Sequence, residues 1–288
     1  MLSAFISSLR TVDLRRKILF TLGIVLLYRV GASVPSPGVN YPNVQQCITQ
    51  ATGGESGQIY SLINLFSGGA LLQLSVFAVG VMPYITASII VQLLGVVIPR
   101  FEQLRKEGQA GQAKLTQYTR YLTIALALLQ STSVVALAAN GGLLQGCSLD
   151  IIQGQSEGLN FVTLATMVIV MTAGAALVMW MGELVTERGV GNGMSLLIFT
   201  SIAAGFPGAA RVVGAAGVGT SVIVSIVVLA VIAGVVYVEQ SQRRIPVQYA
   251  KRVVGRRTLG GTSTYIPLKI NMAGIIPVIF ASSLLALP

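Results

Sequence analysis

Long apolar runs, separated by short polar segments, form the dominant pattern along the chain. The runs cover residues 18–34, 121–139, 161–181, 194–205, 220–238 and 270–288. Most of them are close to the roughly 20 residues that an α-helix needs to cross the hydrocarbon core of a bilayer. The run at 194–205 is shorter, and we expect its helix to extend both ways through glycine-rich flanks. The pattern predicts an all-α polytopic membrane protein.

The first run follows three basic residues, Arg15, Arg16 and Lys17, an arrangement that is also typical of a signal peptide. Arg29 inside the run and the proline-containing segment 35–38 after it fit a cleavage site poorly. We therefore interpret this run as a retained first transmembrane helix.

The apolar stretch at residues 59–98 does not fit a single crossing. It is too long for one transmembrane helix and too short for two with a polar turn, and Gly68, Gly69 and Pro83 interrupt it. We predict a re-entrant half-helix over about 59–72, followed by a full helix over about 75–98. Non-helical backbone at membrane depth must be shielded by protein or face a water-filled cavity, so a broken helix suggests a conduction pathway. The alternative is a tilted helix after an amphipathic segment on the membrane surface.

Basic residues lie almost entirely on one side of the predicted topology. Of the 19 lysines and arginines, all except Arg29 and Arg211 fall before the first run or in alternate loops after it. By the positive-inside rule, the N-terminus and these loops are cytoplasmic. The loops at 35–58, 140–160 and 206–219 then lie on the non-cytoplasmic side.

Both cysteines, Cys47 and Cys147, belong to non-cytoplasmic loops, where a disulfide is chemically possible. Nothing in the sequence brings the two thiols together. We expect them to remain unpaired.

Composition supports the membrane class and removes the obvious intramembrane enzymes. Hydrophobic residues make up 53% of the 288 positions and charged residues only 10%, with a mean hydropathy of +0.78. The absence of histidine excludes a zinc protease of the H-E-x-x-H type, and the only aspartates, Asp13 and Asp150, lie outside the runs, which argues against an aspartyl protease. We expect no catalytic residue, metal or cofactor, so any transport must draw energy from a partner or a gradient.

The longest cytoplasmic segment, 239–269, has weak strand character at 245–249 and 263–266 and a turn at Gly260-Gly261. It predicts a hairpin-like projection with basic residues near its tip. Such a tip could engage RNA phosphates, an acidic protein or lipid headgroups, or it could serve only to fix the topology.

Specific strings narrow the interpretation further. They are FSGGA at 66–70, MPYITASIIVQLL at 82–94, KEG at 106–108, QYTRY at 117–121, TERGVGNG at 186–193, QRRIPV at 242–247, YAKR at 249–252 and NMAGIIP at 271–277. In this order, and spread over the whole chain, they resemble the SecY family, the channel subunits of the bacterial Sec protein translocase. The resemblance implies a protein-conducting channel for secretion and membrane insertion of unfolded polypeptides, located in the bacterial plasma membrane.

The resemblance also assigns a plug and a pore. The half-helix would be the plug that closes the channel from outside, and a ring of bulky aliphatic side chains would seal the pore without binding a passing chain. The plug residues are Phe66, Ser67, Gly68 and Gly69, and the ring residues are Val81, Ile85, Ile198 and Ile279. Valine at position 81 is smaller than isoleucine, so the ring is expected to be slightly loose.

The gate and the docking surfaces follow in the same way. Gln92 and Asn271 would form a polar pair that holds the lateral gate shut until a signal sequence displaces it. The partner-docking residues would be Arg105, Lys106, Arg243, Arg244, Lys251, Arg252, Arg256 and Arg257. The implied partners are the SecE and SecG subunits, the SecA motor ATPase, the ribosome, signal sequences with their unfolded precursor chains, and the lipid bilayer.

The family pattern of ten helices in two inverted halves divides this chain unevenly. Residues 1–17 would be the cytoplasmic N-terminus, 18–210 the first half with helices 1–5, and 211–288 the start of the second half with helices 6–7 and the loop 239–269. The later helices are absent, so we expect residues 1–288 to be unable to translocate a precursor alone.

Two further classes remain as alternatives. A secondary transporter with a broken-helix binding site needs an ionisable group inside a span to bind the coupling ion, and the span interiors almost lack one. Glu183, Glu187 and Glu239 lie at cytoplasmic helix ends, where we expect them to stabilise interfaces or neighbouring arginines. The third class is a membrane anchor or assembly factor without a conduit.

Overall fold

The described part of the protein divides into two compact units. The computed structural model describes residues 11–51, 68–141, 149–153, 160–215, 217–247, 252–254, 257–259 and 264–271. The first unit extends to Gly208 and the second begins at Ala209. Among the described residues, the regular elements of the first unit are all helices, whereas the second unit also contains β-strands.

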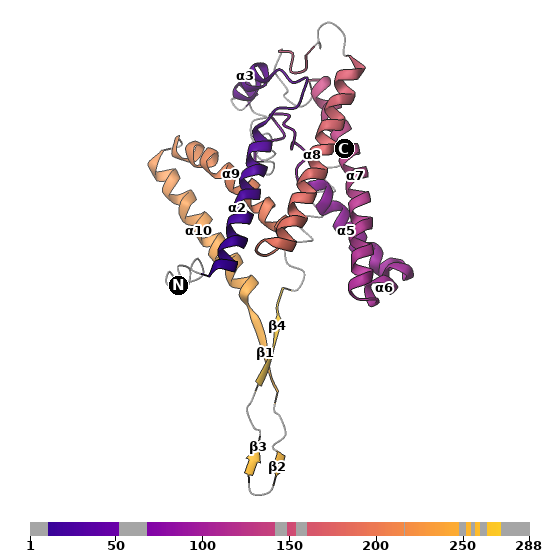
Figure 1. Cartoon of the computed structure of the whole chain (residues 1–288). Helices are drawn as coiled ribbons and strands as arrows, with labels where there is room; N and C mark the ends of the chain where they lie inside the picture. Colours follow the sequence, from indigo (N-terminus) through magenta and orange to yellow (C-terminus); the bar gives the residue numbers. More distant parts are fainter. Residues whose placement is uncertain are drawn as a thin grey trace. The chain divides into compact units, whose positions relative to one another are not determined.

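The first unit is a set of helices joined by turns (Figure 1). They are α2 Val12–Ser33, α3 Tyr41–Ala51, α5 Met82–Val97, α6 Pro99–Lys106, α7 Gln109–Ala139, α8 Phe161–Arg188 and α9 Gly193–Ala215, the last of which continues into the second unit. α7 packs against α5 and α8, and α2 packs against α8. The helices predicted from the runs at 18–34, 121–139, 161–181 and 194–205 are confirmed.

Three of the described helices are long and apolar enough to cross a membrane. They are α7, α8 and α10 (Val218–Gln240). α5 and α6, which meet at 97°, would add a fourth crossing if they form one broken span. α9 extends past Gly205 to Ala215, as expected from its glycine-rich flank, although Pro207 lies inside it.

α7 begins twelve residues earlier than the apolar run predicts, at Gln109 instead of Tyr121. Its buried residues Gly111, Leu115, Thr119 and Thr123 recur every fourth position, so one buried stripe continues from the polar segment into the apolar one. Burial of that stripe, rather than hydropathy, determines where the helix starts.

The start of α5 differs from the prediction. The predicted full helix is confirmed over residues 82–97, but its predicted start at 75 is wrong, because α5 begins only at Met82. The half-helix ending at 72 is also wrong for the described residues, because residues 68–81 form turns. Leu74 and Gly80 adopt positive φ angles of 48° and 58°, which a right-handed helix cannot contain. Pro83 then lies in the first turn of α5, where its missing N–H is not needed. Residues 59–67 of the predicted half-helix lie outside the described residues.

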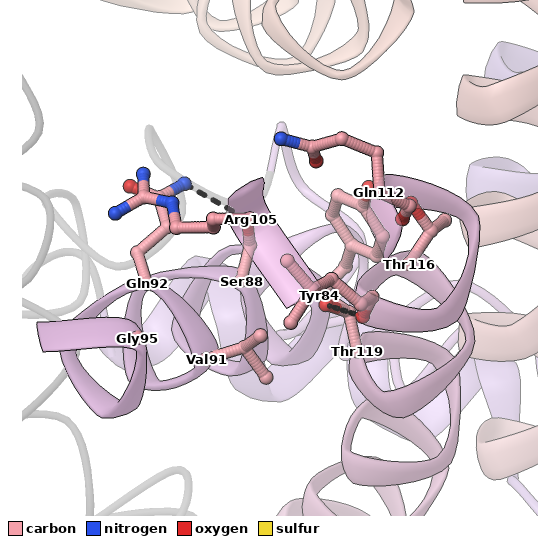
Figure 2. A pocket seen from close by; sticks show the side chains of 10 residues that line it. Tyr84, Ser88, Val91, Gln92, Gly95, Arg105, Gln112, Thr116 and Thr119 are labelled. Atoms are coloured by element: carbon pink, nitrogen blue, oxygen red, sulfur yellow. Dashed lines mark hydrogen bonds between the residues drawn. The ribbon is translucent and has the colours of Figure 1, made fainter. Parts of the chain in front are cut away.

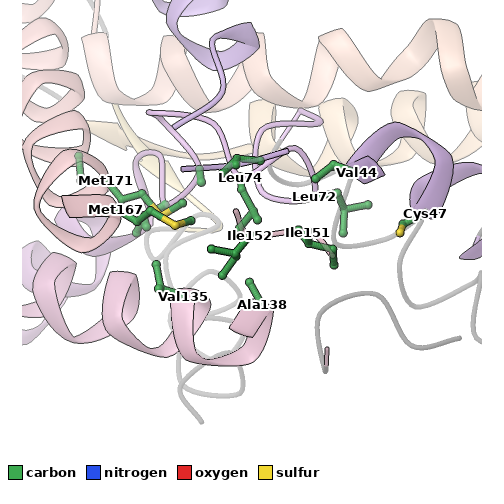
Figure 3. Packing of buried hydrophobic residues seen from close by; sticks show 14 of the residues in the cluster. Val44, Cys47, Leu72, Leu74, Val135, Ala138, Ile151, Ile152, Met167 and Met171 are labelled. Carbon is green, nitrogen blue, oxygen red and sulfur yellow. The ribbon is translucent and has the colours of Figure 1, made fainter. Parts of the chain in front are cut away.

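The turn segment is held by an apolar cluster over one end of α7 and α8 (Figure 3). The cluster contains Val44, Cys47, Leu72, Leu74, Val135, Ala138, Ile151, Ile152, Met167 and Met171. Backbone hydrogen bonds join the segments that contribute to the cluster. The Ser36 N–H donates to Leu74 O at 3.0 Å, the Val76 N–H to Val34 O at 3.0 Å, and the Asn40 N–H to Ile151 O at 2.8 Å. Two loops predicted to be non-cytoplasmic, 35–58 and 140–160, therefore pack with the turn segment 68–81 into one cap.

Cys47 corrects the expectation of unpaired thiols. Its side chain is fully buried in this cap, and it is disulfide-bonded. The sequence contains only one other cysteine, Cys147, which lies outside the described residues. The spacing of the two cysteines in the sequence did not predict a disulfide. The position of the Cys47 thiol is set by packing of α3 into the cap and not by proximity along the chain.

Gly174 allows α8 to lie directly against the turn segment. A Cβ at this position would overlap the carbonyl oxygen of Val76, a backbone atom that cannot rotate away. We expect Gly174→Ala to lower the free energy of unfolding by about 1–3 kcal/mol, as overpacking of a tight core does. Thermal unfolding of the purified protein in detergent would measure this loss.

Gly23 provides the matched control for that substitution, since a Cβ there meets nothing within 4 Å. Gly23→Ala also replaces a helical glycine, so it should leave stability unchanged or raise it by up to about 1 kcal/mol. Equal midpoints for the two variants would contradict the close contact between α8 and the turn segment.

The second unit contains α10 followed by a long antiparallel hairpin (Figure 1). β1 (Gln242–Val247) pairs with β4 (Thr264–Lys269), and β2 (Arg252–Val254) pairs with β3 (Arg257–Leu259). The predicted hairpin-like projection is confirmed, although its strands begin and end at different residues. The predicted seventh helix, except for residues 270 and 271, lies outside the described residues.

Candidate functional site

Three of the four predicted ring residues lie in one apolar cluster. Val81 is buried, and Ile85 and Ile198 are partly buried against the same group, which includes Phe77 and Leu197. Val81 precedes α5 and accepts the hydrogen bond of the Ile85 N–H at 3.2 Å, so the two side chains lie one helical turn apart on the same face. Ile279, the fourth ring residue, lies outside the described residues.

The chemistry of this cluster suits a seal. Its aliphatic side chains offer neither donor nor acceptor to water, and branched chains without fixed polar partners can move apart without breaking hydrogen bonds. A narrow passage lined in this way excludes water and ions when its walls are in contact. It also has no group that would hold a passing chain at one residue type.

The second feature of the site is a contact that sequence patterns did not predict. Arg29 of α2 donates a hydrogen bond from Nη1 to the carbonyl oxygen of Gly68 at 2.8 Å. Its neighbour Tyr28 hydrogen-bonds Ser201 of α9 between the two hydroxyl oxygens at 2.7 Å and stacks on Phe77, with ring centroids 5.9 Å apart. We call Tyr28, Arg29, Gly68 and Ser201 the Gly68 junction. In the sequence, the only indication of this junction is Arg29, a single cation within the apolar run 18–34.

Gly68 and Gly69 are the predicted plug residues that the structure describes. Both have left-handed backbones, with φ of 63° and 92°, which side chains other than glycine rarely adopt. The other two plug residues, Phe66 and Ser67, lie outside the described residues. The glycine pair thus forms a sharp turn directly before the packed segment that leads to α5.

A polar pocket of about 330 Å³ lies between α5, α6 and α7 (Figure 2). Among its lining residues are Gln92, predicted for the lateral gate, and Arg105, predicted for partner docking. Gln92 donates to Ser88 Oγ at 3.4 Å, whereas Asn271 donates to Glu239 at 3.0 Å within the second unit. Each of the two predicted gate residues therefore has a partner close to it in sequence or in its own unit, and a pairing of Gln92 with Asn271 stays a prediction.

An ion pair joins α7 and α8 at the ends assigned to the cytoplasm. Arg120 binds Glu183 through two parallel contacts, Nε to Oε1 at 2.9 Å and Nη2 to Oε2 at 2.8 Å. The Glu183 side chain is only 14% exposed, and two-point pairing fixes the relative rotation of the helices. The expectation that Glu183 stabilises a neighbouring arginine is confirmed.

The string at 186–193 has a structural explanation in the turn between α8 and α9. Asn192 Oδ1 accepts hydrogen bonds from the N–H groups of Met194 and Ser195 at 3.1 and 3.4 Å, which caps the start of α9. Thr186 Oγ1 accepts the Gly193 N–H at 2.9 Å. The turn therefore fixes the first residues of α9, from which Ile198 projects one turn later.

The predicted docking residues lie on two separate elements. Arg105 and Lys106 are exposed in the last turn of α6, where Lys106 pairs with Glu102 at 2.7 Å. The hydrogen bond from Lys106 lowers the pKa of the Glu102 carboxyl. In the described part of the chain, Arg105, the other cation of that turn, takes part in no ion pair.

The hairpin carries the other predicted docking residues. Arg243 and Arg244 are exposed on β1, and the Arg244 guanidinium lies 4.8 Å from the ring centre of Tyr265. Arg252 and Arg257 lie in β2 and β3, and Lys251 and Arg256 lie outside the described residues.

The β1–β4 register separates the hairpin into two faces. Ile245 lies opposite Ile266 and Arg243 opposite Leu268 on one face, while Arg244 lies opposite Pro267 and Pro246 opposite Tyr265 on the other. One face is therefore mainly aliphatic, and the other presents a cation supported by an aromatic ring.

Comparison with known proteins gives consistent matches. A sequence profile of the SecY family matches residues 75–288. The chain is 75% identical to the protein translocase subunit SecY of Mycobacterium tuberculosis over 289 residues, covering 100% of this chain and 65% of the relative, and 58% identical to that of Streptomyces coelicolor, covering 100% and 66%. The chain thus spans about 65% of the length of the curated relatives it matches.

Solved structures match at the level of the fold. A protein-conducting channel superposes with a TM-score of 0.54 at 19% identity, covering 94% of this chain and 56% of that one. Sec61 in the canine ribosome–channel complex gives a TM-score of 0.52 at 19% identity, with the same coverage.

Proposed function

The chain belongs to the SecY family, and from that premise we propose that it contributes the pore and the plug attachment of a protein-conducting channel. The channel carries unfolded polypeptides across the plasma membrane for secretion and releases hydrophobic segments sideways into the bilayer. It has no catalytic residue of its own. Energy comes from the partner that pushes the polypeptide.

The observation that carries this proposal is the shared cluster of Val81, Ile85 and Ile198 beside the left-handed Gly68-Gly69 turn. Residues far apart in sequence supply an aliphatic constriction, and a segment with a non-helical backbone leads to it. A constriction of this kind seals against ions yet accepts side chains of any type, as a channel for unfolded chains requires.

Orientation and partners complete the proposal. The basic loops are cytoplasmic, together with the N-terminus, which follows from the positive-inside rule. The exposed cations of α6 and of the hairpin dock the SecA motor ATPase or the ribosome, whose phosphates and acidic groups complement them. SecE and SecG complete the assembly, and Gln92 and Asn271 line the lateral gate.

A crosslinking experiment tests the pore assignment. We use a full-length chimera in which these 288 residues replace the matching part of the Mycobacterium tuberculosis relative. A photoreactive residue at Ile85 or Ile198 should crosslink to a secretory precursor stalled during transport. Leu129 is the control position, because its side chain is 60% exposed on α7 and should contact lipid. Adducts that form equally at Leu129, or only there, would refute the pore assignment.

A further inference from the structure

Arg29 is placed where a cation costs free energy. Its neighbours on α2, Leu26, Leu27 and Val30, are exposed apolar side chains of the run that we predict to be the first transmembrane helix. An arginine near the non-cytoplasmic end also opposes the charge bias that orients the protein. A guanidinium in such surroundings needs a strong acceptor, and the structure provides one in the Gly68 carbonyl oxygen at 2.8 Å.

Gly68 is held on its other side by α9. A Cβ at this glycine would lie 2.9 Å from the backbone oxygen of Ser201, so the two backbones are in close contact. Ser201 Oγ donates to Leu197 O at 3.0 Å, which leaves the Tyr28 hydroxyl to donate to Ser201 Oγ at 2.7 Å. α2 and α9 therefore hold the same glycine between them, α2 through a charged hydrogen bond and α9 through van der Waals contact.

We propose that Arg29 is the positioning residue that latches the plug in the closed channel. The inference rests on the proposed channel function, because Gly68 and Gly69 belong to the predicted plug. When the plug leaves, Gly68 must move away from Ser201, and the guanidinium loses its acceptor. Water entering the opened pore can then replace that acceptor, so the latch couples plug release to pore hydration.

The geometry explains why arginine suits this position. Its five donors allow Nη1 to bind Gly68 while other N–H groups remain available for water, and its long side chain crosses the gap between two segments. Lysine would keep the charge and offer a donor, but without the planar group. Methionine is of similar length and has neither charge nor donor.

The test uses the full-length chimera in proteoliposomes with Arg29→Met, Arg29→Lys and, as matched control, Arg211→Gln. Arg211 is the other basic residue assigned to the non-cytoplasmic side. Arg29→Met should raise the resting ion leak about tenfold, the change expected from the loss of one charged hydrogen bond, and should admit a precursor with a defective signal sequence. Arg29→Lys should fall between Arg29→Met and the parent, and Arg211→Gln should match the parent.

A second measurement covers the case in which Arg29→Met weakens folding. Hydrogen–deuterium exchange of residues 68–75 in detergent should become faster in both Arg29 variants, with the largest change in Arg29→Met. Unchanged leak with unchanged exchange in Arg29→Met overturns the latch, as does an equal leak in Arg211→Gln. If the parent chimera does not carry an ordinary precursor, the proposed channel function is rejected. Faster exchange of residues 68–75 in the Arg29 variants would still establish that Arg29 holds Gly68.

Discussion

Replacing Ile85 and Ile198 together by glycine should raise the resting ion conductance of the full-length chimera at least about tenfold. The two side chains are partly buried in the same aliphatic cluster as Val81, on α5 and α9. Burying one such side chain is worth about 1.5–3 kcal/mol, so removing two of them lowers the cost of wetting the constriction by more than the roughly 1.4 kcal/mol that equals a tenfold change. Planar-bilayer recordings without a precursor measure the effect directly.

Glycine also weakens helices, by about 1 kcal/mol at each exposed interior position. The matched control is therefore Leu129→Gly with Ile169→Gly, which places the same defect at exposed positions of α7 and α8, where the side chains are 60% and 66% exposed. The control should leave the conductance near the parent level. Conductance that stays unchanged in the ring variant, or rises equally in the control, would remove Ile85 and Ile198 from the seal.

Hydropathy was sufficient for the long helices. α8 and α10 coincide with apolar runs because a bilayer admits few structures other than helices of about 20 residues, so the run alone specifies the element. The same reasoning failed at residues 68–81, which are as apolar as a helix. There the backbone forms turns because Ser36 and Val34 of a distant loop exchange hydrogen bonds with Leu74 and Val76. Hydropathy contains no information about such partners.

The candidate site was predictable only in part, and for a related reason. Val81, Ile85 and Ile198 were proposed from resemblance, because no local pattern distinguishes a pore-facing isoleucine from one in a core. Arg29 was visible as an anomaly, but its acceptor is 39 residues away, and Tyr28 is 173 residues from Ser201. The disulfide of Cys47 depends in the same way on burial of one face of α3, with Val44 and Cys47, in the cap.

Charge on the hairpin leads to the second large effect. Residues 240–269 contain seven basic residues and no acidic one, so the hairpin has no internal partner for its cations. Arg244 rests on Tyr265, and the register places Arg257 opposite Val254 near the far end of the hairpin. An unneutralised basic projection attracts acidic protein surfaces or RNA phosphates, and the attraction weakens with salt.

Reversing two of these charges, Arg256→Glu with Arg257→Glu, should weaken binding of the docking partner to the full-length chimera about tenfold or more. Each exposed ion pair contributes up to about 1 kcal/mol, and reversal replaces attraction by repulsion at both positions. The experiment measures the affinity of chimera vesicles for SecA and for ribosomes at low and at physiological salt, where the difference from the parent should shrink as salt rises.

Arg256→Lys with Arg257→Lys is the matched control, since it keeps both charges and changes only the geometry of the donors. It should bind close to the parent level if charge dominates, and more weakly toward ribosomes alone if two-point contacts to phosphate contribute. Unchanged affinity of the reversed variant for both SecA and ribosomes would show that the hairpin charges only orient the protein. Charge alone would attract SecA and ribosomes alike, because both present anionic surfaces. A loss of affinity for one partner alone would therefore show that the hairpin also fits that partner by shape, and would identify it as the partner that the hairpin docks.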